Sequence, residues 1–326
     1  MRVVRARDAL SLDAYRIEEE PPPEPGEGQV RIRVRACGLG FVDALTAAGR
    51  YQVKPPLPFT PGVEVAGEVA AVGPGVRGVA LGARVVPMVS TRGALAEQVL
   101  APAAQLALIP DAMSFEQAAS LRSNTLTALY ALHNRAGLRP GESVLVFGAA
   151  GGVGGAAIQV SKLLGAHVIA VASTAEKRAH ALGLGADLAI DTEPAEWRDR
   201  LKQLAAGRMP DVVVDPVCGP LFEPAFRSLV WNGRYLVVGF AAGAIPTLAA
   251  NLPLLKGAAL IGVDIRQFNL NEPDLAEMNR QQLRRWLTEG AIEPQVGEVF
   301  PFEAFRDALA HAAKGASGGK TVVRVG

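Results

Sequence analysis

The sequence has little of what several protein classes require. Its two cysteines, Cys37 and Cys218, are too few for a disulfide framework or a four-cysteine zinc site. Neither sign of charge dominates, because 33 basic residues face 32 acidic ones and the net charge is +1. No basic stripe is present, so nucleic acid is not expected as a ligand. Two charge-free stretches, 143–161 and 235–255, are interrupted by glycine or proline, which argues against a membrane span.

Targeting and metal signals are also missing. The first residues, MRVVRARDALS, have no long apolar core of the kind a secretory signal needs. The four histidines are scattered and offer no metal-ligand spacing. Because alanine and glycine are abundant, we expect a cytoplasmic protein, and the length of 326 residues suits two domains.

A glycine-rich segment carries most of the information that is present. Val144–Phe147 reads as a buried strand, followed by the turn AAGGVG, a helical pattern and a second strand, His167–Ala172. This order predicts the first half of a dinucleotide-binding βαβ unit, with a pyrophosphate at the start of the helix. Gly151 allows close backbone approach and Gly154 allows close helix packing, whereas Ala149 replaces the usual first glycine.

The end of the second predicted strand indicates which cofactor is bound. An NAD site usually has Asp or Glu here, about 20 residues past the glycines, but this chain has Ser173. A carboxylate would repel a 2′-phosphate, whereas the hydroxyls of Ser173 and Thr174 and the ammonium of Lys177 would hold it. The pattern therefore favours NADPH. Arg178 is either an additional phosphate ligand or part of a solvated helix face.

The rhythm of the chain predicts two domains of different construction. Residues 1–120 contain short alternating strands punctuated by proline and glycine, which is typical of an antiparallel barrel. From about 122, strands and helices alternate as in a doubly wound parallel sheet. We expect a catalytic domain made of 1–122 and 265–326, and a nucleotide-binding domain over 123–264.

Together these segments resemble the medium-chain dehydrogenase/reductase superfamily, and more narrowly its zinc-free NADPH:quinone oxidoreductase branch. The resemblance rests on five blocks: GFVDALTAAGRYQVKPPLPFTPGVEVAGEVAAVG (40–73), RPGESVLVFGAAGGVG (139–154), DVVVDPVCGP (211–220), GRYLVVGFAAGAIP (233–246) and GGKTVV (318–323). It implies an α/β fold in which a Rossmann domain accompanies a GroES-like, mainly antiparallel β-barrel domain. It also implies a homodimer, joined through an edge strand near Ala259–Asp264.

The resemblance bears on zinc as well. Alcohol dehydrogenases of the superfamily bind catalytic zinc through a cysteine and a histidine, at the places that Gly40 and Val63 take here. Neither side chain can ligate a metal, and Cys37 matches a position that is not a ligand. Without a Lewis acid, electrophilic acceptors such as quinones or enones fit better than alcohols.

The resemblance also names site residues. Tyr51 is the candidate hydroxyl donor to the substrate oxygen, unless its ring only packs at a domain edge. Asp43 lies by the substrate or only caps a short helix, and Thr127 reaches the nicotinamide or bonds back to its own helix. The implied cofactor set is Gly40, Phe41, Thr127, Ala149, Gly151, Gly152, Val153, Gly154, Ser173, Thr174, Lys177, Thr192, Pro216, Val217, Gly239, Phe240, Ala241 and Lys320.

Three positions depart from the branch. Gly40 replaces an asparagine near the nicotinamide, and Thr192 replaces a tyrosine near the adenosine phosphate. Cys218 replaces a glycine, either as a small buried hydrophobe or as a thiol near the cofactor.

Three functions therefore compete. The first is an NADPH-dependent quinone reductase, and the second an enoyl or alkenal reductase of the acryloyl-CoA type, for which Arg50, Lys54 and Arg266 are candidate CoA contacts. The third is an NADPH-binding sensor or RNA-associated protein with little turnover.

Overall fold

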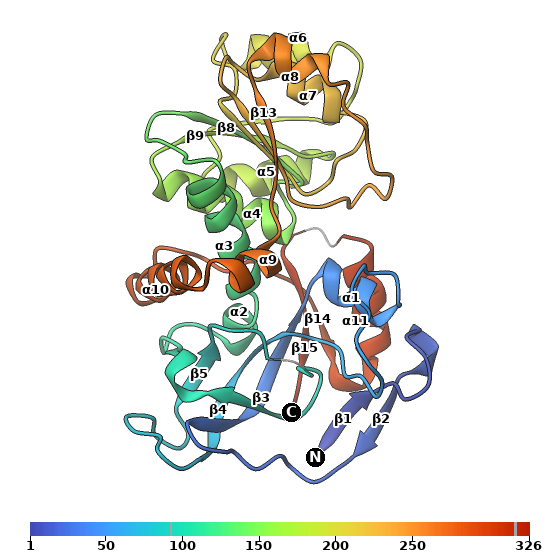
Figure 1. Cartoon of the computed structure of the whole chain (residues 1–326), viewed down its shortest axis with the longest axis vertical. Coiled ribbons are helices and arrows are strands. Elements are labelled where there is room, and N and C mark those ends of the chain that lie inside the picture. The colour runs from blue at the N-terminus through green and yellow to red at the C-terminus, as the bar shows by residue number, and fades with distance from the viewer. Residues whose placement is uncertain (92, 316–317) are drawn as a thin grey trace. The chain divides into compact units, whose positions relative to one another are not determined.

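The computed structural model describes residues 1–91, 93–315 and 318–326. The chain forms two compact units, of which the first comprises Met1–Ser123 with Leu287–Gly326 and the second comprises Asn124–Trp286. In Figure 1 the second unit is coloured from green to orange, and the first from blue to teal and, for its last part, red. The division differs from the expected one at residues 265–286, which belong to the second unit.

The first unit is built on a seven-stranded sheet in the order β14-β15-β3-β4-β5-β7, with β6 also paired to β3. Its pairs are antiparallel except β14 with β15, which are parallel. A separate antiparallel pair joins β1 and β2. The strands are β1 (Arg2–Arg5), β2 (Arg16–Glu19), β3 (Gln29–Leu39), β4 (Glu64–Val72), β5 (Arg84–Pro87), β6 (Gln98–Pro102), β7 (Leu106–Leu108), β14 (Val296–Pro301) and β15 (Lys320–Arg324).

Short helices complete the first unit. They are α1 (Phe41–Ala47), α2 (Phe115–Ala118) and α11 (Phe305–Ala313), with 3₁₀ turns η1 (Leu12–Ala14), η2 (Ala103–Gln105) and η4 (Phe302–Ala304). Helix α2 begins at a capping box, in which the Ser114 hydroxyl accepts from the Gln117 amide and the Gln117 side chain accepts from Ser114. The core between sheet and helices includes Ile32, Val65 and Phe305. The mainly antiparallel domain expected from the sequence is confirmed.

The second unit contains a six-stranded sheet in the order β10-β9-β8-β11-β12-β13, and every pair is parallel. The strands are β8 (Ser143–Phe147), β9 (His167–Val171), β10 (Leu188–Ile190), β11 (Val212–Asp215), β12 (Arg234–Val237) and β13 (Ala259–Gly262). Strands β8 and β11 are buried along their whole length, as expected where helices cover both faces. The order reverses between β8 and β11, and the predicted doubly wound sheet is confirmed.

The helices of the second unit alternate with its strands and then continue past the sheet. They are α4 (Gly152–Leu163), α5 (Ala175–Gly183), α6 (Trp197–Leu204), α7 (Phe222–Ser228), α8 (Asn251–Lys256), α9 (Ile265–Asn271) and α10 (Pro273–Glu289). Helix α3 (Arg122–Leu129) and the π-helical turn η3 (Tyr130–Arg135) precede the sheet.

Helices α9 and α10 pack onto this unit through two contacts with η3. The ring of Phe268 stacks on Tyr130, with centroids 4.1 Å apart. The side-chain amide of Asn279 donates to Asn134 at 2.8 Å. These contacts explain why the division falls within α10, after Trp286, rather than near residue 265.

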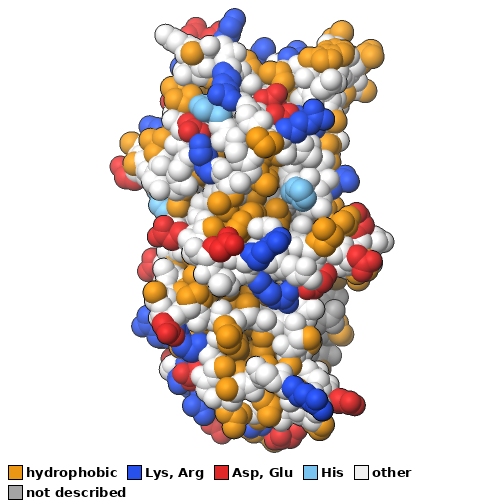
Figure 2. Space-filling view, turned by 90° about the vertical axis from the view of Figure 1, so that its left-hand side faces the viewer, with side chains coloured by type: hydrophobic (Ala, Val, Ile, Leu, Met, Phe, Trp, Pro, Cys, Tyr) orange, Lys and Arg blue, Asp and Glu red, His pale blue; other side chains and the backbone are white. Residues whose placement is uncertain are grey.

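The surface is mixed in charge. On the face drawn in Figure 2, basic and acidic side chains are interspersed. Within residues 1–91, 93–315 and 318–326, no helix combines the length and apolar character that crossing a membrane requires.

Candidate functional site

Loops from three strands meet at the carboxyl edge of the parallel sheet. An ideal Cβ on Gly148, after β8, would lie 3.1 Å from a methyl carbon of Val217, after β11. The amide of Ala241, after β12, donates to the Pro216 carbonyl at 3.2 Å, and Ala242 donates to Val217 at 3.0 Å. This is the point where the strand order reverses, and open α/β sheets bind their ligands there.

The glycines of the first loop are required by close backbone contacts. Gly148 has φ +58°, and a Cβ on Gly154 would lie 2.1 Å from the Gly148 carbonyl oxygen. Gly151 precedes α4 in an extended conformation, and no side chain caps the helix there. The first intrahelical bond runs from the Gly155 amide to Gly151, so the earlier amides have no acceptor within the helix. Such a turn suits an anion like a pyrophosphate.

A buried carboxylate that sequence reasoning missed holds the loop after β11. One oxygen of Asp215 accepts from the amides of Val217 and Cys218, each at 2.8 Å. The other accepts from the Tyr235 hydroxyl on β12. Burial raises the pKa of Asp215, although these bonds oppose the shift. The available signal was an aspartate that closes a buried Val-Val-Val strand just before Pro216.

Cys218 lies in this loop as a buried thiol. Its side chain is 1% exposed and its φ is +50°, a left-handed conformation that favours glycine. Burial also raises the pKa of the thiol well above its usual range. Of the two alternatives left open for Cys218, the small buried hydrophobe agrees with this environment.

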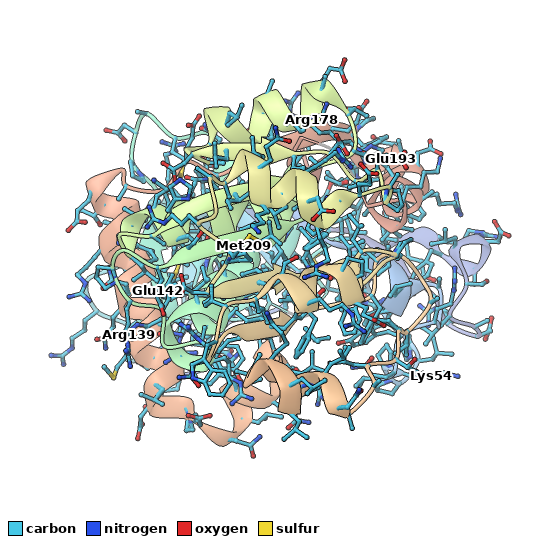
Figure 3. All side chains as sticks on the ribbon, turned by 90° about the horizontal axis from the view of Figure 1, so that it is seen from above. Lys54, Arg139, Glu142, Arg178, Glu193 and Met209 are labelled. Carbon is cyan, nitrogen blue, oxygen red and sulfur yellow. The ribbon has the colours of Figure 1, made fainter. Side chains whose placement is uncertain are left out.

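The end of β9 presents hydroxyls and cations. Ser173 and Thr174 are exposed, and the Thr174 hydroxyl caps α5 by accepting from the Lys177 amide at 3.3 Å. The guanidinium of Arg178 donates back to the carbonyls of Ala172 and Ser173, at 3.1 and 3.3 Å. In Figure 3, Arg178 and Glu193 lie on the opposite side of the unit from Arg139 and Glu142, which precede the first strand of the sheet.

One carboxylate belongs to the first turn of α5. The pKa of the exposed Glu176 is lowered by its own backbone amide and by Thr174. Thr192, beyond β10, is exposed, and the neighbouring Asp191 is held by Arg200 at 2.8 Å. The carboxylate of Asp191 is therefore already matched by a cation.

In the first unit, the Gly40–Asp43 turn starts α1. The carboxylate of Asp43 accepts from the Gly40 amide at 2.8 Å, a bond that agrees with the alternative of a helix cap. Asp43 is 8% exposed, and burial raises its pKa although Lys320 opposes the shift. Phe41 and Tyr51 are half-buried, and the Tyr51 amide donates to Leu45 in α1 at 3.2 Å. The segment thus folds against its own helix.

A buried ion pair lies in the same unit. The Lys320 ammonium is bonded to one oxygen of Glu64, and the other oxygen accepts from the amides of Arg122 and Ser123 at 2.6 and 3.2 Å. Burial would raise the pKa of Glu64, but Lys320 and Arg122 outweigh it and hold this pKa below its ordinary value. Lys320, which was expected to reach the cofactor, is instead 4% exposed and committed to this carboxylate.

Gly40 and Val63 stand at the two positions where the similar alcohol dehydrogenases have zinc ligands, and neither has a side chain that can bind a metal. Gly40 has no side chain, and Val63 contributes only its carbonyl, which accepts from Arg122 at 2.8 Å. Across the part of the chain that the structure describes, no three His, Cys, Asp or Glu side chains gather as a metal site would require.

The structure brings together most of the expected cofactor residues of the second unit. Those at the carboxyl edge are Ala149, Gly151, Gly152, Val153, Gly154, Ser173, Thr174, Lys177, Thr192, Pro216, Val217, Gly239, Phe240 and Ala241. Thr127 lies on α3, whose neighbouring residue Asn124 contacts Gly152. Gly40, Phe41, Asp43 and Tyr51 form a separate set around α1 in the first unit.

Comparison with known protein families gives one match in each of the two units. Residues 26–111 match the family model described as the alcohol dehydrogenase GroES-like domain. Residues 152–280 match the one described as zinc-binding dehydrogenase. Quinone oxidoreductase-like protein 2 of Mus musculus is 37% identical over 288 residues, which cover 88% of this chain and 82% of that protein.

Solved structures show the same likeness along the whole chain. The quinone oxidoreductase of Thermus thermophilus, solved alone and with NADPH, has a TM-score of 0.83 and 35% identity, covering 99% of this chain and 100% of that one. The CurK enoyl reductase has a TM-score of 0.87 and 25% identity, covering 99% of each chain.

Proposed function

This chain belongs to the medium-chain dehydrogenase/reductase superfamily, in its quinone oxidoreductase branch, and we propose that it uses NADPH to reduce quinones or related activated acceptors without a metal. One observation supports the proposal that the reaction needs no metal ion. The dinucleotide loop keeps Gly151 and Gly154, whereas Gly40 and Val63 stand where zinc ligands would be needed. A quinone is already electrophilic, so its reduction does not need a Lewis acid.

The cofactor-binding part of the proposal uses the carboxyl edge of the second unit. The first amides of α4 would bind the pyrophosphate, with Gly154 allowing the approach of helix and loop. Ser173, Thr174 and Lys177 would hold the adenosine 2′-phosphate. When bound, NADPH supplies a hydride from its nicotinamide ring.

We assign a positioning role to the loop after β11. The buried carboxylate of Asp215 fixes the amides of Val217 and Cys218, and Pro216 in turn accepts from Ala241. The two loops are therefore held in one arrangement before any ligand arrives. Such preorganisation suits a cofactor that must be oriented accurately for hydride transfer.

On the substrate side, we assign Tyr51 as the hydroxyl donor to the acceptor oxygen, where negative charge develops. Asp43 supports this region by capping α1 beside Gly40. Exposed apolar side chains near these residues, Val42, Val53 and Leu57, favour an acceptor with an apolar body.

A second candidate is reduction of a conjugated alkene, such as an enoyl thioester. The CurK enoyl reductase is similar over the whole chain. Arg50, Lys54 and Arg266 are exposed and carry the positive charge that a CoA phosphate would need. Arg266 also pairs with Asp264 at 3.3 Å, which weakens its claim.

A panel of acceptors separates these candidates. NADPH consumption should be measured with ortho- and para-quinones, enones and enoyl-CoA thioesters, for wild type and Tyr51→Phe. We expect the quinones to give the highest kcat/KM and Tyr51→Phe to lower it about 100-fold, as loss of one oxyanion donor does. Highest activity with enoyl-CoA would favour the second candidate. Tight NADPH binding with no turnover would favour a sensor or RNA-associated role.

We also propose that the protein is a cytoplasmic homodimer. Strand β13 ends the parallel sheet and pairs only with β12 among the strands the structure describes. Leu254, Leu255 and Leu260 on α8 and β13 are 78, 71 and 44% exposed. An apolar sheet edge of this kind is normally covered. Light scattering at micromolar concentration should give the mass of a dimer, and Leu260→Lys the mass of a monomer; a monomeric wild type would contradict the proposal.

A further inference from the structure

The side chain of Asn124, on α3, lies against the start of α4. An ideal Cβ built on Gly152 would be 2.5 Å from the amide nitrogen Nδ2 of Asn124, 3.0 Å from its Cγ and 3.1 Å from its Oδ1. The shortest of these distances is too small for a real Cβ, so a side chain at position 152 would displace the Asn124 amide. The glycine at this position lets the amide lie beside the start of α4.

The side-chain amide of Asn124 can donate hydrogen bonds at the start of α4. The residue is only partly buried, and within the described ranges of the chain no hydrogen bond of its side chain to another residue is found. An asparagine carries two N–H donors and no charge. The neighbouring helix start offers only backbone amides, since no side chain caps α4. Thr127, three residues further along α3, lies on the same helix face.

We propose that Asn124 is a further cofactor-binding residue, whose side-chain amide donates to a pyrophosphate oxygen at the start of α4. This inference rests on the proposed position of the pyrophosphate. It adds a donor from a separate helix to the backbone amides of the glycine loop. The donor is neutral, so it strengthens binding of the phosphate shared by NADPH and NADH without distinguishing between the two.

Two substitutions of Asn124 test the proposal through binding rather than turnover. Dissociation constants for NADPH and NADH should be measured from the fluorescence of the bound reduced nicotinamide. A hydrogen bond to a charged group corresponds to roughly a tenfold to hundredfold change in affinity. We therefore expect Asn124→Ala to weaken both cofactors about 10-fold. Asn124→Asp should weaken both by about 100-fold or more, because its carboxylate repels the phosphate. Asn271→Asp, an exposed change on α9, is the matched control and should leave both constants unchanged.

A double substitution tests the same contact from the side of α4. Gly152→Ala alone should displace the Asn124 amide, because its Cβ meets Nδ2, and should lower NADPH affinity about as much as Asn124→Ala does. Gly152→Ala added to Asn124→Ala should weaken NADPH no further, because no amide is left to displace. Wild-type NADPH affinity in both Asn124→Ala and Asn124→Asp would overturn the inference. If wild type binds NADPH but reduces no quinone, the proposed acceptor fails while this inference stands.

Discussion

The buried ammonium of Lys320 is bonded to the carboxylate of Glu64, although 256 positions separate the two residues in the sequence. They come from β15 and β4, two strands of the same sheet, which both pair with β3. Glu64 is 1% exposed and Lys320 is 4% exposed, so neither charge is solvated. The pair therefore ties β15 to β4 through an interaction that is costly to break.

Glu64→Gln should destabilise the first unit by about 3–5 kcal/mol, because it leaves the ammonium buried without its anion. Chemical denaturation, followed by a probe in the first unit, measures the change. Glu223→Gln, which removes an exposed ion pair with Arg227 in α7, is the control and should cost about 0.5 kcal/mol or less. Equal effects of the two substitutions would show that the buried pair contributes little.

The pKa of Asp43 predicts a pH dependence of stability. Burial raises this pKa above that of the unfolded chain, about 4, so between the two values the folded protein binds more protons than the unfolded one. Stability contributed by Asp43 is therefore present below about pH 4 and is lost as the pH rises through the folded pKa.

Asp43→Asn removes this titration and keeps an oxygen that accepts from the Gly40 amide. The free energy of unfolding of wild type, relative to Asp43→Asn, should fall as the pH rises through that window and then level off. Urea denaturation at a series of pH values measures it. A constant or rising difference would contradict the buried environment assigned to Asp43.

Because the backbone at Cys218 is left-handed, we expect a glycine substitution at this position to be more stable than an alanine substitution. Cys218→Gly and Cys218→Ala both remove the thiol, but only glycine adopts a φ of +50° without steric cost. The glycine variant should therefore be more stable than the alanine variant by about 1 kcal/mol. Calorimetry of the two variants provides the comparison, and greater stability of Cys218→Ala would show that the backbone is not strained.

Ser173 should decide cofactor choice. Ser173→Asp places a carboxylate where the 2′-phosphate is proposed to bind, and it should weaken NADPH about 100-fold while leaving NADH nearly unchanged. Titration with each cofactor measures the ratio of the two dissociation constants. Gln203→Glu adds the same charge at an exposed position of α6 and should leave this ratio unaltered. Parallel loss of both cofactors in Ser173→Asp would place the phosphate elsewhere.

The parts of the fold that local pattern controls could be predicted from the sequence. The glycine turn between β8 and α4 is specified by contiguous residues, and the alternation of strands and helices indicates a parallel sheet. The partnership of Asp215 with Tyr235 could not be predicted, because it forms only when β11 and β12 pair side by side. Lys320 was likewise assigned to the cofactor because nothing near it in the sequence reveals Glu64.

Residues 265–286 illustrate a different limit. The sequence predicts a helix near 273–289, where α10 forms, but not α9, which precedes it. A helical pattern alone does not indicate which domain the helix packs against. Phe268 stacks on Tyr130 and thereby attaches this segment to the second unit.

Oxidation of NADPH by a quinone, after exhaustive treatment of the protein with a metal chelator, tests metal independence and cofactor choice together. We expect the chelator to leave the rate with NADPH unchanged, and kcat/KM with NADPH to be at least about tenfold greater than with NADH. Loss of activity on chelation, restored by added zinc, would contradict the metal-independent mechanism. Equal use of NADH would contradict the role given to Ser173 and Lys177.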